Sequence, residues 1–305
     1  MAGLKAIKTK IRSVEKTQKV TKAMEAVSAA KMRKAQQRAL AGRAYARAAA
    51  AVLARTSSSR ALMGSALAQP RAINRALYIV ITSDKGLAGA LNSAVLRAAA
   101  ADIKSMHLAP SQVEVIAVGR KANDFFATRG YAISNFYANT DQVDSALMRQ
   151  MVEDAAKRFE GGEVDIVKIG YQNFVSTFEQ RATLHTIFPL SLTELREVVD
   201  DILPVRGVYA AQSDTSAEHM VYTVEPGEAE VLSAILPRLA SIFVYHALLE
   251  TQASEHSARM VAMKSASDKA GEMRGSLTLK FNKARQAAIT REVSEITGGM
   301  EAMNN

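Results

Sequence analysis

The chain has 305 residues, a formal net charge of +9 and no cysteine. Its length allows two ordinary domains, and its 48% hydrophobic content allows a substantial core. The absence of cysteine excludes disulfides and thiolate metal sites. No run reaches the roughly 18 apolar residues of a membrane span, and the first residues lack the apolar region of a signal peptide. These features indicate a protein that is soluble or attached peripherally to a membrane.

Positive charge is concentrated at the N-terminal end of the chain. Residues 1–60 contain 15 Lys and Arg against two acids, Glu15 and Glu25, a balance of +13 that leaves −4 for the remainder. The positive field therefore belongs to one element, and we expect an acidic surface to face it.

Residues 2 to about 60 are predicted to form a single helix, because no proline occurs before Pro70. An apolar face with three- and four-residue spacing begins at Leu4 and reaches Val14. Two successive three-residue steps then follow, which predicts a stammer that locally overwinds a coiled coil. Beyond the stammer, the packed face is predicted to contain Thr17, Val20, Met24 and Val27.

The middle of the chain alternates apolar runs with helical patterns, which is typical of a doubly wound, Rossmann-like α/β domain. We place this domain at residues 73–210. The pattern predicts strands at 76–82, 113–119, 132–137 and 165–171, an antiparallel edge strand at 178–188, and helices at 90–106, 121–128 and 141–159.

The C-terminal part, residues 226–305, is predicted to be a second long helix. Its residues recur alternately four and three apart, a spacing that favours a coiled coil. Pro237 is expected either to kink this helix or to mark its effective start. The N-terminal helix, residues 1–60, is the expected antiparallel partner, with the α/β domain inserted between the two. The predicted seam contains Ile235, Leu239, Ile242, His246, Leu249, Ala253, His256, Met260 and Met263, followed by Ala266, Ala270, Met273, Leu277, Phe281, Ala284 and Ala288.

No catalytic, cofactor-binding or metal-binding set can be identified in this sequence. The turn Gly86-Leu-Ala-Gly89 follows the first strand but matches no phosphate-binding fingerprint, so a tight strand-to-helix connection is the better interpretation. The five histidines never pair at helical spacing. His246 and His256 are interpreted as packed seam residues.

The basic segment Lys31-Met-Arg-Lys34 has three interpretations: a solvated helix face, a nucleic-acid contact, or a docking face for an acidic protein. Stacking aromatics and groove-binding motifs are missing around it, which argues against nucleic acid as a partner. The methionines at 24, 32, 260 and 263 would supply adaptable apolar contacts at a docking surface, or fill the core.

Several motifs resemble the gamma subunit of bacterial F-type ATP synthases, and together they cover the chain from end to end. The N-terminal helix carries Lys16-Thr-Gln-Lys-Val-Thr-Lys-Ala-Met24 and Ala30-Lys-Met-Arg-Lys34, and the middle domain carries Thr82-Ser-Asp-Lys-Gly-Leu-Ala-Gly-Ala-Leu-Asn92. The last helix carries Ser254-Glu-His-Ser-Ala-Arg-Met-Val-Ala-Met-Lys264, Phe281-Asn-Lys-Ala-Arg-Gln-Ala-Ala-Ile-Thr290 and Thr297-Gly-Gly299.

This resemblance implies a non-catalytic rotor shaft. It would transmit rotation from a membrane c ring to an alpha/beta hexamer, where ion flow drives ATP synthesis from ADP and phosphate. One copy per complex, with an epsilon subunit as a further partner, would sit peripherally on the cytoplasmic side of the cell inner membrane. The lack of a transit peptide is expected to reflect a bacterial source.

The resemblance also assigns partner-binding residues. The alpha/beta hexamer would be contacted by Lys19, Met24, Lys31, Arg33, Lys34, Arg259, Met260, Met263, Lys264, Arg285, Gln286 and Thr290, and the c ring and epsilon subunit by Tyr222, Glu225 and Pro226. We expect Arg259, Lys264, Arg285 and Gln286 to lie on the outer face of the last helix. Two alternatives stay open: a nucleic-acid-binding coiled coil and a nucleotide-dependent enzyme on the α/β domain.

Overall fold

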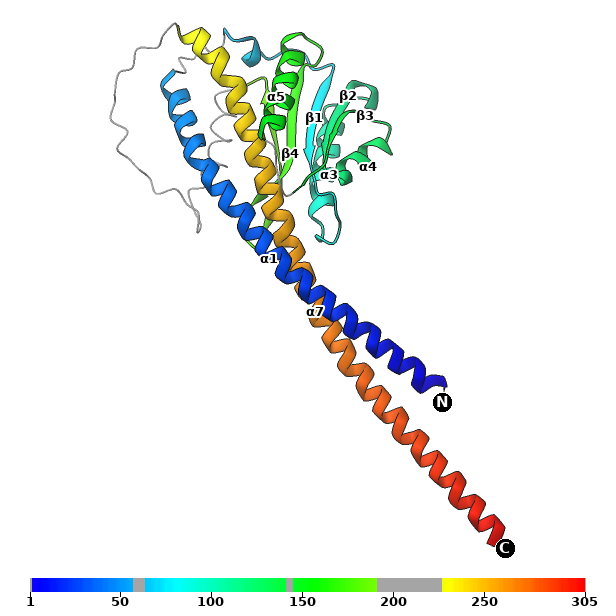
Figure 1. The fold of residues 1–305 in the computed structure, drawn as a ribbon. Coiled ribbons are helices and arrows are strands. Elements are labelled where there is room, and N and C mark those ends of the chain that lie inside the picture. The colour runs from blue at the N-terminus through cyan, green and yellow to red at the C-terminus, as the bar shows by residue number, and fades with distance from the viewer. Residues whose placement is uncertain (1, 57–63, 141–144, 191–226, 305) are drawn as a thin grey trace. The chain divides into compact units, whose positions relative to one another are not determined.

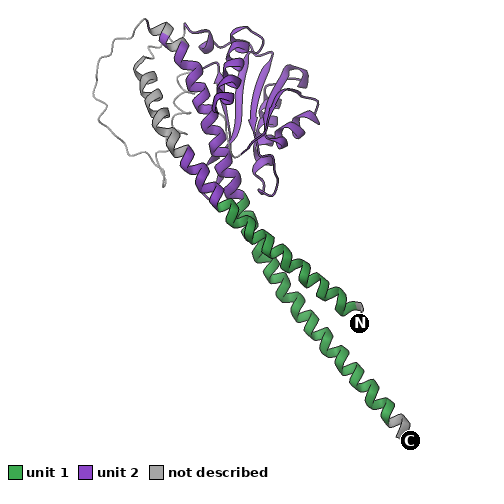
Figure 2. Ribbon diagram, in the orientation of Figure 1, with its two compact units in different colours: residues 1–29, 259–305 green, residues 30–258 purple. Residues whose placement is uncertain are grey.

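The structure is a computed structural model that describes residues 2–56, 64–140, 145–190 and 227–304; for residues 39–56 it describes the helix but not the side chains. The chain divides into two compact units (Figure 2). Unit 1 contains Met1–Ala29 and Arg259–Asn305, and unit 2 contains Ala30–Ala258.

Two long helices form the ends of the chain, as the sequence predicts. Helix α1 covers Ala2–Thr56 and helix α7 covers Glu228–Asn304 (Figure 1). Residues 57–60, which the predicted first helix also included, lie outside the described residues. Pro237 lies inside α7, so the expectation that it marks the start of the helix is wrong. The helix begins nine residues earlier and continues past the proline, where the Ser241 hydroxyl donates to the Pro237 carbonyl at 2.8 Å.

In unit 1, the start of α1 and the end of α7 pack against each other in opposite directions. A Cβ placed on Gly271 would lie 2.9 Å from the Gln18 side-chain amide, so the two backbones approach closely there. One turn earlier on α1, Glu15 interacts electrostatically with Arg274, one turn later on α7. From the first of these contacts to the second, the residue number falls on α1 and rises on α7, so the two helices are antiparallel.

The packed face of α1 corrects one prediction. Val20 and Val27 are 57% and 56% exposed, whereas Thr21 and Ser28 are 8% and 3% exposed. The predicted stammer is therefore wrong, since the seven-residue spacing continues without interruption. Apolar character misled the prediction, because small polar side chains occupy the contact and valines face outward. The α1 residues of unit 1 that are buried or half-buried at this spacing are Leu4, Ile7, Ile11, Val14, Gln18, Thr21, Glu25 and Ser28.

The predicted seam of α7 also needs one correction. Met273 is 46% exposed, although Ala270 and Leu277 on either side of it are buried and half-buried. Met263 is buried as predicted, at 5% exposed. The predicted seam of α7 is thus right for most of unit 1 and wrong at Met273.

Unit 2 is built on a five-stranded sheet with the order β3-β2-β1-β4-β5 (Figure 1). Strands β1 to β4 are parallel to one another, and β5 pairs antiparallel with β4, as predicted for the edge. The strands are β1 Ala76–Ile81, β2 Val113–Val118, β3 Ala132–Tyr137, β4 Ile166–Phe174 and β5 Gln180–Phe188.

Helices cover both faces of the sheet, so β1 is buried along its whole length. Leu77, Ile79 and Ile81 point into a core shared with α5 and with α7, while Tyr78 and Val80 point into the core beneath α3 and α4. This explains the continuous apolar run, because a strand covered on both faces has no solvent side. The covering helices are α3 Leu91–Ser105, α4 Arg120–Ala127 and α5 Ser145–Glu160; the short 3-10 helices are η1 Ala66–Ala68 and η2 Pro110–Gln112.

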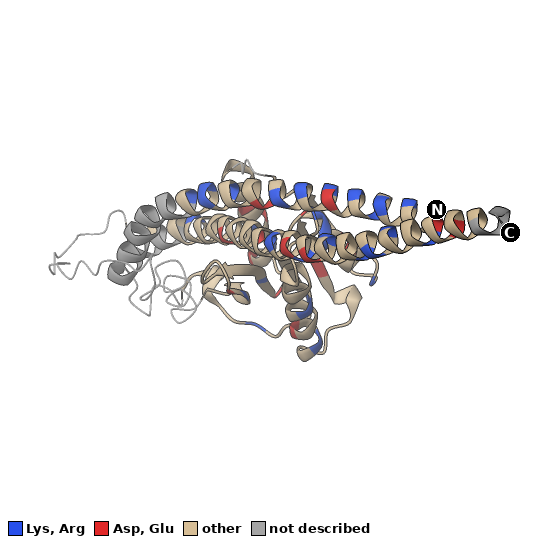
Figure 3. Cartoon of the chain, turned by 90° about the horizontal axis from the view of Figure 1, so that it is seen from below, with Lys and Arg blue, Asp and Glu red and all other residues tan. Residues whose placement is uncertain are grey.

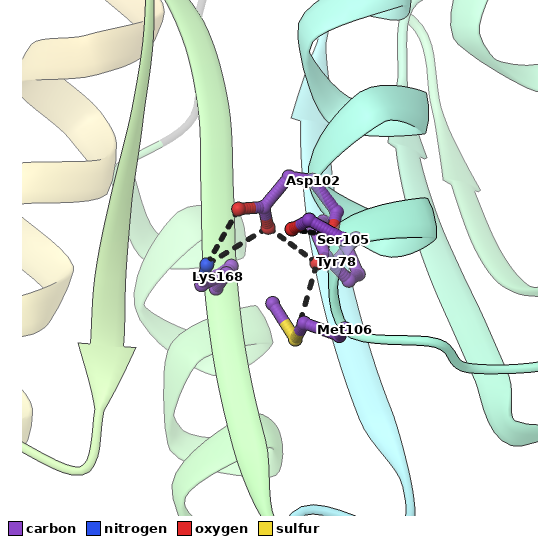
Figure 4. A network of polar contacts seen from close by, with 5 residues as sticks. All are labelled: Tyr78, Asp102, Ser105, Met106 and Lys168. Carbon is purple, nitrogen blue, oxygen red and sulfur yellow. Dashed lines mark hydrogen bonds and ion pairs between the residues drawn. The ribbon is translucent and has the colours of Figure 1, made fainter.

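The core beneath α3 contains one polar network (Figure 4). The buried Tyr78 hydroxyl donates to Asp102 Oδ2 at 2.6 Å, and Lys168 Nζ lies 2.9 and 2.8 Å from the two Asp102 oxygens. Burial, and then the hydrogen bond to Asp102, raise the pKa of Tyr78 far above its usual value of 10.0. The network ties α3 to two neighbouring strands.

Removing this hydroxyl should lower stability in a pH-dependent way. Tyr78→Phe is expected to reduce the free energy of unfolding by about 1–2 kcal/mol at pH 8. A raised pKa in the folded state stabilises the fold fully below the unfolded-state pKa of about 10 and progressively less above it. The difference between wild type and Tyr78→Phe should therefore shrink from pH 8 to pH 11 in urea unfolding. A difference that does not change with pH would contradict this assignment.

Candidate functional site

The basic face of α1 is exposed. Lys and Arg recur along the described part of this helix, with Glu15 and Glu25 as its acids (Figure 3). Lys19 pairs with Glu15 at 3.0 Å, and the hydrogen bond and charge of Lys19 lower the Glu15 pKa. Both partners are on the surface, so this pair contributes little to stability. Among the α1 residues whose side chains are described, the exposed cations are Lys5, Lys8, Lys10, Arg12, Lys16, Lys19, Lys22, Arg33 and Lys34.

The predicted site residues on α1 divide between the two units. Lys19, exposed, and Met24, half-buried, belong to unit 1. Lys31, half-buried, and the exposed Arg33 and Lys34 belong to unit 2. All five keep some accessible surface, as a docking face requires.

The predicted site residues on α7 do not share one environment. Lys264, Arg285 and Gln286 are exposed, as expected for the outer face. Arg259 is only 8% exposed, so its expected place on the outer face is wrong. The charge of Arg259 predicts a position facing solvent, but charge alone does not reveal which face of the helix is covered. Of the remaining three residues, Met260 is half-buried and Met263 is buried. Thr290 is exposed, and its hydroxyl donates to the Gln286 carbonyl at 3.0 Å.

The other predicted contact set lies outside the described residues. Tyr222, Glu225 and Pro226 belong to the segment 191–226, which also contains the end of the predicted α/β domain. Their assignment to a c ring and an epsilon subunit stays a prediction.

The C-terminal end of α7 presents an apolar stripe that the sequence reasoning missed. Ile289, Val293, Ile296 and Met300 are 51–64% exposed and recur four, three and four residues apart. Every residue from 291 to 300 is exposed, because α1 provides no packing along this part of α7. The continued heptad spacing could have indicated that an apolar partner covers this end.

A second missed feature is a buried polar row on the part of α7 that belongs to unit 2. We call Glu250, Thr251, Gln252, Ser254 and Ser257 the polar row; each is at most 7% exposed. A helix that only filled a core would present apolar side chains here. The row instead makes hydrogen bonds to the end of β4 and to neighbouring loops.

The contacts of the polar row are mostly to backbone groups. Thr251 Oγ1 accepts from the Gln172 N–H at 3.2 Å, and the Ser254 hydroxyl donates to the Gln172 carbonyl at 3.3 Å. Glu250 Oε2 accepts from the Phe174 N–H at 2.9 Å. These backbone groups need partners because β1 pairs with β4 only as far as Gly170, while β4 continues to Phe174.

Two further contacts extend the polar row beyond β4. The Ser257 hydroxyl donates to the Thr177 carbonyl at 2.7 Å, in the turn between β4 and β5. The Gln252 amide donates to Asn139 Oδ1 at 2.9 Å and to the Thr140 carbonyl at 2.7 Å, after β3. Helix α7 is therefore hydrogen-bonded both to the end of β4 with its following turn and to the segment after β3.

The motif that begins at Thr82 has a structural role at that edge. Thr82 Oγ1 accepts from the Ala122 N–H at 2.9 Å, and Asp84 Oδ1 accepts from the Arg120 N–H at 2.8 Å. These oxygens satisfy free N–H groups at the start of α4, as capping residues do. The turn at Gly86–Gly89 leads into α3, which begins at Leu91, in keeping with a tight strand-to-helix connection.

Within the described residues, no cluster of histidines and carboxylates could hold a metal ion, and no helix is long and apolar enough to cross a membrane. His246 and His256 are 5% and 7% exposed, so the interpretation of both as packed residues is confirmed. The exposed features in this part of the chain include a basic helix face and an apolar helix end. Both are suited to binding other proteins.

Comparisons with known proteins agree with this description. A family model described as ATP synthase matches residues 3–303. The chain is 36% identical to an ATP synthase gamma chain of Pelotomaculum thermopropionicum over 304 residues, covering 99% of this chain and 100% of that one. It is 39% identical to the ATP synthase gamma chain of Xanthomonas campestris pv. campestris, with the same coverage.

Solved structures show the same fold at lower identity. A chain of the Euglena gracilis mitochondrial ATP synthase matches 99% of this chain and 95% of its own length, with a TM-score of 0.64 and 19% identity. A chain of the central stalk and c ring of the Tetrahymena thermophila mitochondrial ATP synthase matches 81% of this chain and 99% of its own, with a TM-score of 0.56 and 23% identity.

Proposed function

We propose, from the premise that this chain belongs to the ATP synthase gamma-chain family, that it is the rotor subunit of a bacterial ATP synthase. In this role it transmits rotation between a c ring in the membrane and a catalytic alpha/beta hexamer, so that ion flow drives ATP synthesis. The beta subunits carry the reaction, and this chain is not an enzyme. One copy per complex lies peripherally on the cytoplasmic side of the inner membrane.

The observation that carries the proposal is the surface of unit 1. Two antiparallel helices pack along a seven-residue repeat and present a basic outer face on α1 and an apolar end on α7. We propose that they form a coiled-coil shaft. Charge complementarity with acidic loops of the hexamer would steer the shaft without a fixed, dry interface. The exposed stripe from Ile289 to Met300 would sit in an apolar bearing of the hexamer.

The remaining assignments follow from this placement. The hexamer is contacted by the α1 residues Lys19, Met24, Lys31, Arg33 and Lys34 and by the accessible α7 residues Met260, Lys264, Arg285, Gln286 and Thr290. The c ring and an epsilon subunit bind the doubly wound, Rossmann-like domain and the segment with Tyr222, Glu225 and Pro226. A gamma chain found only as a free monomer, never with alpha, beta and epsilon subunits, would overturn this assignment.

Met24 provides the direct test of the shaft surface. Met24→Lys adds a cation to a helix face that is already basic, and it should impair coupling more than folding. We expect at least a several-fold lower ratio of ATP-driven ion pumping to ATP hydrolysis in membranes, with unchanged subunit assembly. Met24→Leu, which keeps the apolar volume, is the control and should retain the wild-type ratio. Normal pumping by Met24→Lys would count against contact between this face and the hexamer.

A further inference from the structure

We propose that the polar row on α7, Glu250, Thr251, Gln252, Ser254 and Ser257, is a torsional key that carries torque between the sheet of unit 2 and α7. This inference rests on the proposed rotor function, because a key of this kind matters only if the two parts are loaded against each other. The buried apolar residues of α7 from Leu236 to Leu248 belong to one hydrophobic core with the sheet. The polar row follows directly after it along the helix.

The two kinds of contact resist load differently. Apolar burial is non-directional, so a helix on an apolar surface loses little free energy when it turns slightly about its axis. Hydrogen bonds weaken steeply once the donor and acceptor leave their preferred distance and angle. Rotation of α7 about its axis would distort the contacts of the polar row together, because each of them joins a side chain of this one helix to a group outside it.

Gln172 is the residue that receives the most contacts from the key. Thr251 and Ser254 bind the N–H and the carbonyl of the same Gln172, at 3.2 and 3.3 Å. The Thr251 hydroxyl proton is donated to the Ala247 carbonyl at 2.8 Å, which orients the oxygen to accept from the strand. The Gln172 side chain, 1% exposed, continues the connection by donating to the Leu91 carbonyl at 2.6 Å. Load on α7 is therefore passed through β4 to the start of α3.

The remaining contacts make the key difficult to displace. Glu250 is 7% exposed and binds the Phe174 N–H, so displacing α7 would remove a charge-assisted hydrogen bond from a buried carboxylate. Gln252 binds Asn139, whose amide in turn donates to the Thr82 carbonyl at 2.8 Å, so the key also reaches the end of β1. Ser257, the last member, lies two residues before Arg259, where the division between the units falls. The key thus occupies the end of the sheet-bound part of α7.

The test is a pair of shape-conserving substitutions, Thr251→Val with Ser254→Ala, in the complete rotor and hexamer complex. A rotation probe is attached in one preparation to the sheet domain through Lys104→Cys and in the other to α7 through Arg238→Cys; both positions are exposed, and the chain has no other cysteine. We expect torque measured through Lys104→Cys to fall at least two-fold, while torque through Arg238→Cys stays at the wild-type value.

The matched control is Thr128→Val with Ser93→Ala. These hydroxyls donate to nearby backbone carbonyls, Thr128 to Asp124 at 2.8 Å and Ser93 to Ala90 at 2.9 Å, but both residues are exposed and neither hydroxyl bonds to α7. This control should leave torque unchanged at both probe positions. A disulfide between Thr177→Cys and Ser257→Cys, added to the unprobed Thr251→Val, Ser254→Ala variant, should restore ion pumping per ATP hydrolysed when oxidised and not when reduced.

The outcomes separate the two proposals. Full torque at both probe positions in the Thr251→Val, Ser254→Ala variant would overturn the torsional key and leave the rotor function intact. An equal loss at both positions would also overturn it, because that is the result of a general packing defect. Absence of rotation at either probe position in the wild-type complex would contradict the rotor function itself.

Discussion

Replacement of Gly119 by alanine is expected to unfold the sheet of unit 2. Gly119 has φ +93°, a conformation that costs other residues energy, and an added Cβ would lie 2.1 Å from the Thr82 carbonyl oxygen. The backbone cannot move away, because the Thr82 N–H donates to Val118 at 2.7 Å and the Gly119 N–H donates to Tyr137 at 2.8 Å. We expect a loss of about 4 kcal/mol or more in the free energy of unfolding.

The control for this prediction is Gly130→Ala. Gly130 also has positive φ, +78°, but nothing lies within 4 Å of an added Cβ. Only the conformational cost applies, so we expect a loss of about 1–2 kcal/mol. Hydrogen exchange of the amides of β1 and β2 measures both variants, because these strands belong to unit 2 alone. Equal effects of Gly119→Ala and Gly130→Ala would show that the close approach to Thr82 does not matter.

The second large effect is expected for Phe243→Ala, at the apolar packing of α7 on the sheet. The Phe243 ring lies edge-on to Tyr171 of β4 at 5.9 Å and to His185 of β5 at 5.6 Å, and the residue is 4% exposed. Truncation removes both aromatic contacts and leaves a cavity, at an expected cost of about 3–5 kcal/mol. Every tenfold change in an equilibrium corresponds to about 1.4 kcal/mol, so amides of β4 and β5 should exchange at least about 100-fold faster.

Leu279→Ala is the matched control on the same helix. Leu279 is 72% exposed and lies in unit 1, so its truncation should leave exchange in β4 and β5 within about 0.5 kcal/mol of wild type. If Phe243→Ala changed exchange no more than Leu279→Ala does, α7 would contribute little to the sheet core. The torsional key would then lack the packed interface that it is proposed to hold in register.

The α/β elements could be predicted closely because each depends on a local pattern. The apolar run at 76–82 became β1, covered on both faces, and the predicted edge strand at 178–188 became the antiparallel β5 at Gln180–Phe188. The motif that begins at Thr82 could be recognised in the sequence, but its structural role could not be predicted. Its oxygens bind N–H groups of α4, about 40 residues away in the chain, and no local pattern records that contact.

The helix faces were harder to predict. Val20 and Val27 suggested a packed face by their apolar character, yet Thr21 and Ser28 occupy it. Arg259 suggested an outer face by its charge, yet it is buried. The spacing of residues in the sequence limits the possible packed face of a helix to one or two neighbouring rows of side chains. The choice between those rows depends on side-chain size at the contact, which belongs to both helices together.

The sequence by itself determined the two long helices, the strand and helix order between them and the basic character of α1, because periodicity and charge are local properties of the chain. Its motifs also indicated the family. Only the tertiary structure decided which face of each helix packs, that α7 extends beyond the start of α1 as an exposed apolar end, and that a polar row binds the sheet edge. The polar row binds where β4 continues past its pairing with β1, and the apolar end is exposed where α7 continues past the start of α1. Such differences in length become visible only when segments distant in the chain are brought together.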